Sequence, residues 1–298
     1  MRILVSGSSG LIGSELVPSL GVAQHEVSRL AREKAGKTDV PWSPERQLSP
    51  KLVEGFDAVV HLAGETIAGR WTREKKLAIR NSRIQGTRTL VEALANTSRK
   101  PRVLITASAI GYYGDRGDEL LREGSLPGRG FLPEVCKEWE AATQPAAQAG
   151  IRCVQMRFGV VLSGRGGALR KMLPPFRLCL GGVIGSGRQY WSWISLSDVV
   201  SAIHHVLRME SVQGPVNLVA PEAATNAEFT HALSRVLGRP ALLPMPAFVA
   251  RSLFGEMADE LLLASQRVEP VKLLASGYHY HQTDLRGAIH EALAVPSH

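Results

Sequence analysis

The chain has 298 residues, and its 44% hydrophobic and 21% charged content excludes large-scale disorder and allows one large α/β unit with a smaller appendage. Its net charge of +8 comes from basic residues scattered singly or in pairs, a pattern that does not favour nucleic-acid binding. Three cysteines without a Cys-x-x-Cys pair predict neither a disulfide framework nor a metal site, and favour a reducing compartment.

The first apolar run, residues 2–5, turns glycine-rich at Gly7, too early for a secretory segment or a membrane span. We therefore expect a cytoplasmic protein without a membrane partner.

Apolar runs alternate with segments of helical periodicity as far as position 220. The predicted strands are 2–5, 25–30, 56–62, 102–106, 152–162 and 215–220. The predicted helices are one that contains Leu16, then 72–98, 134–149 and 198–209. This alternation is typical of α/β proteins with a doubly wound parallel sheet and right-handed crossovers.

Beyond position 162 the glycine content rises and the alternation stops. Helices are expected near 226–237, 247–264 and 284–293, after a region rich in proline and glycine. We expect a main domain of residues 1–162, to which 195–220 returns, and a smaller C-terminal subdomain of 163–194 and 221–298.

The turn at residues 7–13 carries three glycines between a strand and a helix, the context in which such a triplet predicts a dinucleotide site. Glycines permit the tight turn, the approach of backbone N–H groups to a pyrophosphate and close helix packing. The alternative is a purely structural corner. The expected cofactor contacts of this turn are Gly7, Ser8, Ser9, Gly10, Leu11, Ile12 and Gly13.

The end of the second strand bears on the choice between NAD and NADP. An acidic residue usually binds the ribose 2′-hydroxyl of NAD there, whereas this chain has Arg32, which favours the 2′-phosphate of NADP(H). Arg29 is a weaker candidate, and a solvated surface arginine beside Glu33 is the alternative for Arg32.

The third strand ends in a His-Leu-Ala-Gly sequence at positions 61–64. Open α/β sheets bind ligands at this edge, so we expect Leu62, Ala63 and Gly64 to line the cofactor. His61 lies inside an apolar run and is expected to be a core histidine rather than a catalyst.

These motifs, together with VLITASAIGYYG at 103–114, GSGRQYWSWI at 185–194 and FGEMADELLLASQRV at 254–268, resemble the extended short-chain dehydrogenase/reductase family, in its atypical "epimerase family" branch. The resemblance covers essentially the whole chain. It implies a Rossmann fold like that of nucleotide-sugar epimerases, NADP(H) in the N-terminal domain, and a small-molecule substrate held against the C-terminal subdomain. It also implies hydride transfer with a tyrosine as general acid/base and a lysine four residues later.

This chain departs from that pattern, because none of its tyrosines is followed four residues later by lysine. Aligning the helix of 134–149 with the family places either Leu132 and Cys136, or Pro133 and Lys137, at the two positions. A functional thiol at Cys136 is a minor alternative to a small buried hydrophobe.

Other groups of this region could replace the missing pair. Ser108 resembles the serine that orients the substrate carbonyl, and Tyr112 or Tyr113 could reach the nicotinamide. Packing with a hydrogen-bonded hydroxyl is the alternative for both tyrosines. Arg157 could contact the cofactor or form an ion pair.

The loop at 185–193 combines glycines, a cation, an amide and aromatics, as ligand pockets do, and we expect Gln189 and Trp191 to face the substrate. Asp198 is expected to cap the following helix in a structural role. Residues 254–268 predict an amphipathic helix, and any exposed remainder could serve a homodimer.

Two hypotheses follow. The chain is either an NADP(H)-dependent oxidoreductase or epimerase-like enzyme for a polar carbonyl or hydroxyl compound, or a catalytically silent NADP(H)-binding sensor or scaffold.

Overall fold

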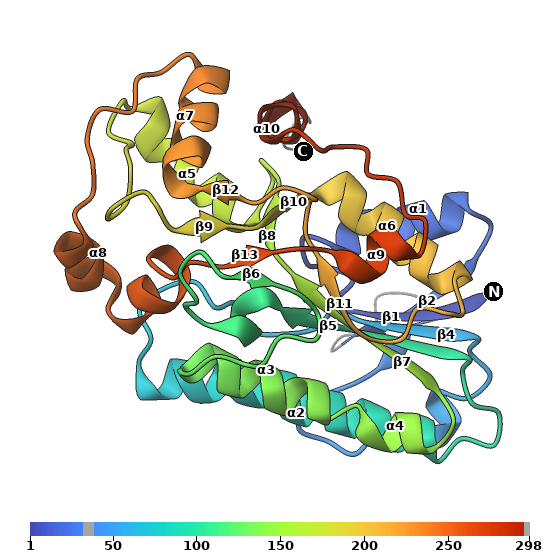
Figure 1. The fold of residues 1–298 in the computed structure, drawn as a ribbon. Coiled ribbons are helices and arrows are strands. Elements are labelled where there is room, and N and C mark those ends of the chain that lie inside the picture. The colour runs from blue at the N-terminus through green and yellow to red at the C-terminus, as the bar shows by residue number, and fades with distance from the viewer. Residues whose placement is uncertain (32–38, 295–298) are drawn as a thin grey trace.

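The computed structural model describes residues 1–31 and 39–294, in which seven strands form one parallel sheet in the order β11-β7-β5-β4-β1-β2-β3 (Figure 1). All six strand pairs are parallel, which confirms the predicted doubly wound sheet. The strands are β1 (Arg2–Ser6), β2 (Glu26–Ala31), β3 (Val40–Pro41), β4 (Ala58–His61), β5 (Val103–Ala109), β7 (Arg152–Phe158) and β11 (Gly214–Leu218).

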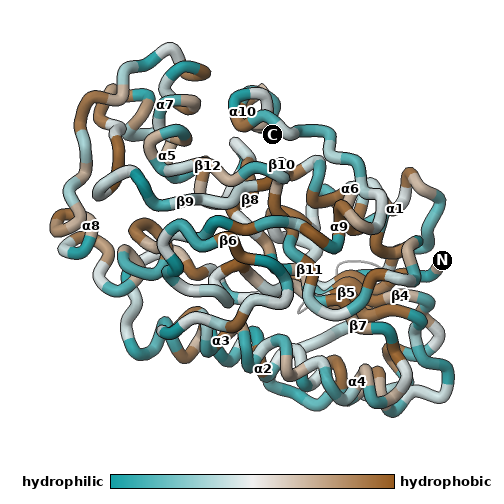
Figure 2. Tube along the Cα trace, viewed as in Figure 1, coloured by the Kyte–Doolittle hydropathy of each residue, from teal (hydrophilic) through white to brown (hydrophobic). Residues whose placement is uncertain are grey.

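Both faces of the sheet are covered by helices, which explains why its strands are continuous apolar runs. Ile3 and Val5 pack on the face covered by α1 (Gly13–Val22) and α6 (Leu196–Arg208), whereas Leu4 faces the other side. That other side is covered by α2 (Arg73–Ala95), α3 (Phe131–Ala141) and α4 (Gln144–Gln148). Figure 2 shows the hydrophobic colours concentrated on the central strands β4, β5 and β7.

The predicted strand of 152–162 is two strands, β7 and β8 (Val160–Leu162), because the chain changes partner at Gly159. Gly159 donates its N–H to Leu218 of β11, and Val160 donates to Ser192 ahead of β10 (Trp193–Ser195). A Cβ on Gly159 would lie 2.6 Å from the Ser192 oxygen. Glycine therefore allows the close approach at which the chain leaves the main sheet.

Beyond β8, apart from α6, β11 and α9 (Val271–Ala275), which pack with the main sheet, the chain forms a second layer of short elements, most of which share a core of their own. These are α5 (Gly167–Arg177), β9 (Tyr190–Trp191), β12 (Ala224–Thr225), α7 (Asn226–Leu237), α8 (Ala247–Phe254), the π-helical turn η3 (Ala258–Leu262) and α10 (Leu285–Ala294). The remaining short elements are η1 (Pro50–Leu52), η2 (Ile110–Tyr113), β6 (Leu120–Leu121), β13 (Arg267–Val268) and α9 (Val271–Ala275).

Local signals explain where several helices begin and end. The α7 helix begins with a capping box of Thr225 and Glu228 and ends at Gly238, which adopts a left-handed conformation. The predicted helix of 247–264 is instead interrupted at Gly255, whose φ is +62°, and the predicted helix of 134–149 is divided into α3 and α4.

The predicted cap of α6 is wrong by one turn. Ser195 is the N-cap, and its hydroxyl accepts the N–H of Asp198. The carboxylate of Asp198 is fully buried, where it accepts hydrogen bonds from the Tyr278 hydroxyl at 2.9 Å and from the backbone of His281 at 2.8 Å. Asp198 therefore ties the C-terminal segment to the start of α6.

Within the described residues, none of the helices combines the length and the apolar run that are needed to cross a bilayer.

Candidate functional site

The glycine-rich turn between β1 and α1 is too crowded for side chains at two of its glycines. A Cβ on Gly7, whose φ is +68°, would lie 2.7 Å from the Leu62 carbonyl carbon, and one on Gly13 would lie 2.2 Å from the Gly7 oxygen. Ser8, Ser9, Gly10, Leu11 and Ile12 lie between them at the start of α1 and are partly or fully exposed. The first N–H groups of a helix lack intrahelical partners, so this turn fits a pyrophosphate.

Ser6, the last residue of β1, connects the end of β4 to the same turn through hydrogen bonds. The Ser6 hydroxyl lies 2.6 Å from His61 Nδ1 and accepts the N–H groups of Leu62 and Ala63. Gly64 is exposed at the end of this sequence. The residues predicted to line the cofactor therefore lie directly beside the glycine-rich turn.

His61 is fully buried, as expected of a core histidine, but only one of its ring nitrogens has a partner. Its Nε2 has none among the described residues, and burial lowers the pKa of His61 to about 4. The ring is therefore neutral and makes an edge contact with Trp42.

Two arginines are predicted to bind the 2′-phosphate, and only Arg29 lies within the described residues. Arg32 lies outside the described residues. Arg29 lies within β2 and its side chain is exposed.

The inward face of α3 decides between the two alignments for the missing catalytic pair. Leu132 and Cys136 are buried one helical turn apart, whereas Lys137 is exposed. Pro133 is buried as well, so burial separates the two alignments only at the second position, where it favours Cys136 and with it Leu132. Burial raises the pKa of the Cys136 thiol to about 12, so the group is a buried hydrophobe and not a reactive thiolate.

One turn further along the same face, Glu140 joins three elements. It accepts a hydrogen bond of 2.6 Å from the Ser108 hydroxyl at the end of β5. Its two oxygens also accept from Nε and Nη2 of Arg157, each at 2.8 Å. The Arg157 side chain is 2% exposed, so the structure shows the ion pair that the sequence left open.

Tyr113 is not accessible as a general acid. Its side chain is fully buried, and its hydroxyl donates to Asn217 Oδ1 at 2.7 Å and lies 2.9 Å from Arg157 Nη1. Burial raises the pKa of Tyr113 to about 12. The packing alternative therefore describes Tyr113, and the expectation that it reaches the nicotinamide is corrected.

Tyr112 lies beside this network with its ring against the Arg157 guanidinium, 3.6 Å from Cζ to the ring centroid. The side chain is partly exposed, and its hydroxyl has no hydrogen-bond partner within residues 1–31 and 39–294.

The sequence did not single out Arg83, which the structure places next to Gly64. It belongs to α2, whose many basic residues resemble a solvated face, so no local signal distinguishes it. Its Nη1 donates to the carbonyl oxygens of Glu65 at 2.9 Å and Ile79 at 3.1 Å, and its guanidinium stacks on the Trp139 ring.

The expectation that Gln189 and Trp191 face a substrate is also corrected, because both side chains are more than nine-tenths buried. Gln189 Nε2 donates to the backbone oxygens of Ile184 and Leu262. Trp191 packs edge-on against Phe229. Both residues therefore stabilise the second layer.

A cavity of about 270 Å³ lies instead between η2, the start of α3 and the segment from α8 to η3. Leu132, at the position of the missing tyrosine, is one of its walls. Charged side chains of both signs line it: Arg129, Arg251, Asp115, Asp259 and Glu260. Arg251 is paired with Asp259.

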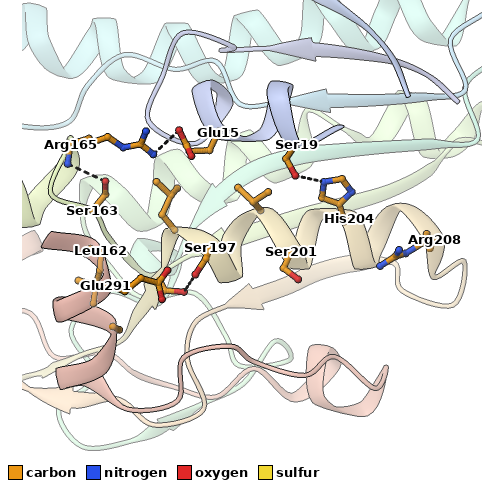
Figure 3. A pocket seen from close by; sticks show the side chains of 15 residues that line it. Glu15, Ser19, Leu162, Ser163, Arg165, Ser197, Ser201, His204, Arg208 and Glu291 are labelled. Atoms are coloured by element: carbon orange, nitrogen blue, oxygen red, sulfur yellow. Dashed lines mark hydrogen bonds and ion pairs between the residues drawn. The ribbon is translucent and has the colours of Figure 1, made fainter. Parts of the chain in front are cut away.

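A larger cavity, of about 610 Å³, lies between α1, α6 and α10 (Figure 3). Its polar side chains are largely paired with one another, including Arg165 with Glu15 and Ser19 with His204. None of the predicted site residues lines it.

A seven-stranded parallel sheet with a glycine-rich turn after its first central strand defines a protein with a Rossmann-like fold. Residues 3–219 match the NAD dependent epimerase/dehydratase family, and residues 245–292 match a domain of unknown function, DUF1731. The chain belongs to the NAD dependent epimerase/dehydratase family, which confirms the resemblance found in the sequence.

Three relatives each match nearly the whole of this chain. An epimerase family protein of Mycobacterium bovis is 44% identical over 297 residues, covering 99% of this chain and 98% of the relative. The crystal structure of the human epimerase family protein SDR39U1 with NADPH is similar with a TM-score of 0.91 and 35% identity, covering 99% and 100% of the two chains. A nucleoside-diphosphate sugar epimerase from Corynebacterium glutamicum gives a TM-score of 0.80 at 36% identity, covering 98% of this chain and 58% of that one.

Proposed function

We propose that this protein binds NADP(H) across the carboxyl edge of its sheet. The glycine-rich turn carries the proposal, because Gly7 and Gly13 leave no room for a Cβ and thereby keep a helix N-terminus open to a pyrophosphate. The human relative of similar fold was crystallised with NADPH. Leu62, Ala63 and Gly64 would line the cofactor, and Arg32 would bind its 2′-phosphate.

We further propose an oxidoreductase or epimerase-like reaction on a polar carbonyl or hydroxyl compound. When bound, the nicotinamide accepts or supplies the hydride. The cavity of about 270 Å³ beside Leu132 is the proposed substrate site, and its charged side chains of both signs fit a polar compound.

Ser108 and Glu140 are the proposed path for the proton. Ser108 is 2% exposed and lies outside the lining of that cavity, so the proposal requires the substrate to reach Ser108 Oγ beyond the cavity wall. In the oxidation of a hydroxyl compound, the substrate hydroxyl proton passes to Ser108 Oγ as the Ser108 proton passes to the Glu140 carboxylate, 2.6 Å away. Reduction of a carbonyl reverses both transfers. Arg157 keeps the carboxylate in place through its two hydrogen bonds.

Ser108→Ala tests this assignment. We expect turnover of NADPH with a responsive carbonyl compound to fall about 100-fold, while the dissociation constant for NADPH changes less than about twofold. Ser234→Ala, at a hydroxyl bonded to the Arg239 oxygen far from the site, is the control. Equal turnover by Ser108→Ala and the wild type would remove Ser108 from the mechanism.

A second candidate is an NADP(H)-binding sensor without turnover. It is favoured by Leu132 and Cys136 at the usual positions of the tyrosine and lysine, and by the inaccessible hydroxyl of Tyr113. Saturable NADPH binding, with no oxidation of the cofactor across a panel of carbonyl compounds and nucleotide sugars, would support it over the enzyme.

A further inference from the structure

We propose that Arg83 binds the nicotinamide half of the dinucleotide and supplies the positive charge that the missing lysine would otherwise provide. The inference rests on the proposed binding of NADP(H), and it concerns a residue that the family motifs do not single out.

The position of Arg83 is the first argument. The carboxyl end of β4 reaches Gly64, and a Cβ on Gly64 would lie 3.4 Å from the Arg83 Cζ. The Cζ atom also lies 5.1 Å from the ring centroid of Trp139, which is on the inward face of α3. The electrostatic neighbours of Arg83 are the Cys136 thiol and the Glu65 carboxylate, so the guanidinium is shared between the α3 side and the loop after β4. The guanidinium therefore lies between the loop expected to line the cofactor and the position of the missing lysine.

The unused donors of Arg83 are the second argument. A guanidinium has five N–H donors, and here both recorded hydrogen bonds come from Nη1. Within the part of the chain that the structure describes, Nε and Nη2 have no partner. The side chain is partly exposed, so these donors are open to an acceptor from outside the chain. A ligand oxygen above Gly64 would accept from these groups.

The topology indicates which half of the dinucleotide lies here. In the sheet order, β2 and β4 flank β1 on opposite sides, so the two halves of a dinucleotide centred on the glycine-rich turn extend over different strands. The adenosine 2′-phosphate belongs to the β2 side, where Arg32 follows in the sequence. Arg83 lies on the β4 side, and its expected acceptors are the hydroxyls of the nicotinamide ribose and the carboxamide oxygen.

The decisive experiment compares NADPH with 2′,5′-ADP, a ligand that keeps the adenosine half and lacks the nicotinamide half. We expect Arg83→Met to weaken NADPH binding about tenfold to hundredfold and to leave the affinity for 2′,5′-ADP within about twofold of the wild type. Arg83→Lys should restore part of the affinity for NADPH, because it keeps the charge while losing the planar fork.

The matched control is Arg80→Met, one turn earlier on α2, where the arginine is paired with Glu138 on the surface. It should leave both affinities unchanged. Equal weakening of the two ligands by Arg83→Met would show a merely structural role and overturn the inference, as would unchanged NADPH binding. If Arg83→Met does not fold, the same comparison is made with Arg83→Lys, whose expected weakening is likewise confined to NADPH. Failure of the wild type to bind either ligand would instead refute the proposed function.

Discussion

The Ser108 hydroxyl donates a hydrogen bond of 2.6 Å to Glu140, although 32 residues separate the two in the chain. The contact joins the carboxyl end of β5 to the inward face of α3, and Arg157 of β7 completes it from the neighbouring strand. In the family, the same face would present the tyrosine and lysine. Here the same face presents the carboxylate of Glu140. It pairs with Arg157 and is the proposed proton acceptor.

Removing that carboxylate should be costly, because it would leave the Arg157 guanidinium buried without a counter-ion. We expect Glu140→Gln to lower the free energy of unfolding by about 3 to 5 kcal/mol, measured by urea denaturation. Glu138→Gln, which breaks only the surface pair with Arg80, should cost about 1 kcal/mol or less. Similar losses in the two variants would contradict the role of burial.

The glycine-rich turn makes a steric prediction. A Cβ at position 13 would lie 2.2 Å from the Gly7 oxygen, so Gly13→Ala should displace the turn and weaken NADPH binding by about 100-fold or more. Titration of NADPH fluorescence measures it. Gly21→Ala, in the same helix with no atom within 4 Å of its new Cβ, should bind normally. Undiminished binding by a folded Gly13→Ala protein would place the cofactor elsewhere.

His61 makes the stability depend on pH. Its pKa is about 4 in the folded protein against 6.5 as the ordinary value, so the unfolded chain binds the proton more readily. The contribution of the neutral ring is complete above pH 6.5 and is lost as the pH falls to about 4, amounting to about 3 kcal/mol. His61→Gln should lack this loss. Parallel stability curves for the wild type and the variant between pH 7 and 4 would disprove it.

Glu260 of η3 caps the start of α3 from the C-terminal segment. Its two oxygens each accept a backbone N–H, from Phe131 and Leu132, both at 2.7 Å. Glu260→Ala should therefore lower the free energy of unfolding by about 1 to 2 kcal/mol. Asp259→Ala removes only the exposed pair with Arg251 and should cost less in the same thermal or urea titration.

The strands of the sheet were predictable because burial on both faces requires continuous apolar runs, as in residues 56–62 and 102–106. The break between β7 and β8 at Gly159 was not predictable. It depends on Ser192, a residue of another segment whose backbone approaches Gly159. The chemistry of Trp191 and Gln189 predicts contact with a ligand, whereas their orientation follows from the packing of the second layer.

The sequence by itself determined the alternating strands and helices, the glycine-rich turn and the absence of a Tyr-x-x-x-Lys pair, since these depend on residue types at short spacings. Only the tertiary structure decided that Leu132 and Cys136 face inward, that Glu140 joins Ser108 to Arg157, and that Arg83 lies beside Gly64. These are contacts between segments that are distant in the sequence. They depend on how a helix is rotated against the sheet. The spacing of residues alone allows two rotations of α3 that differ by one position.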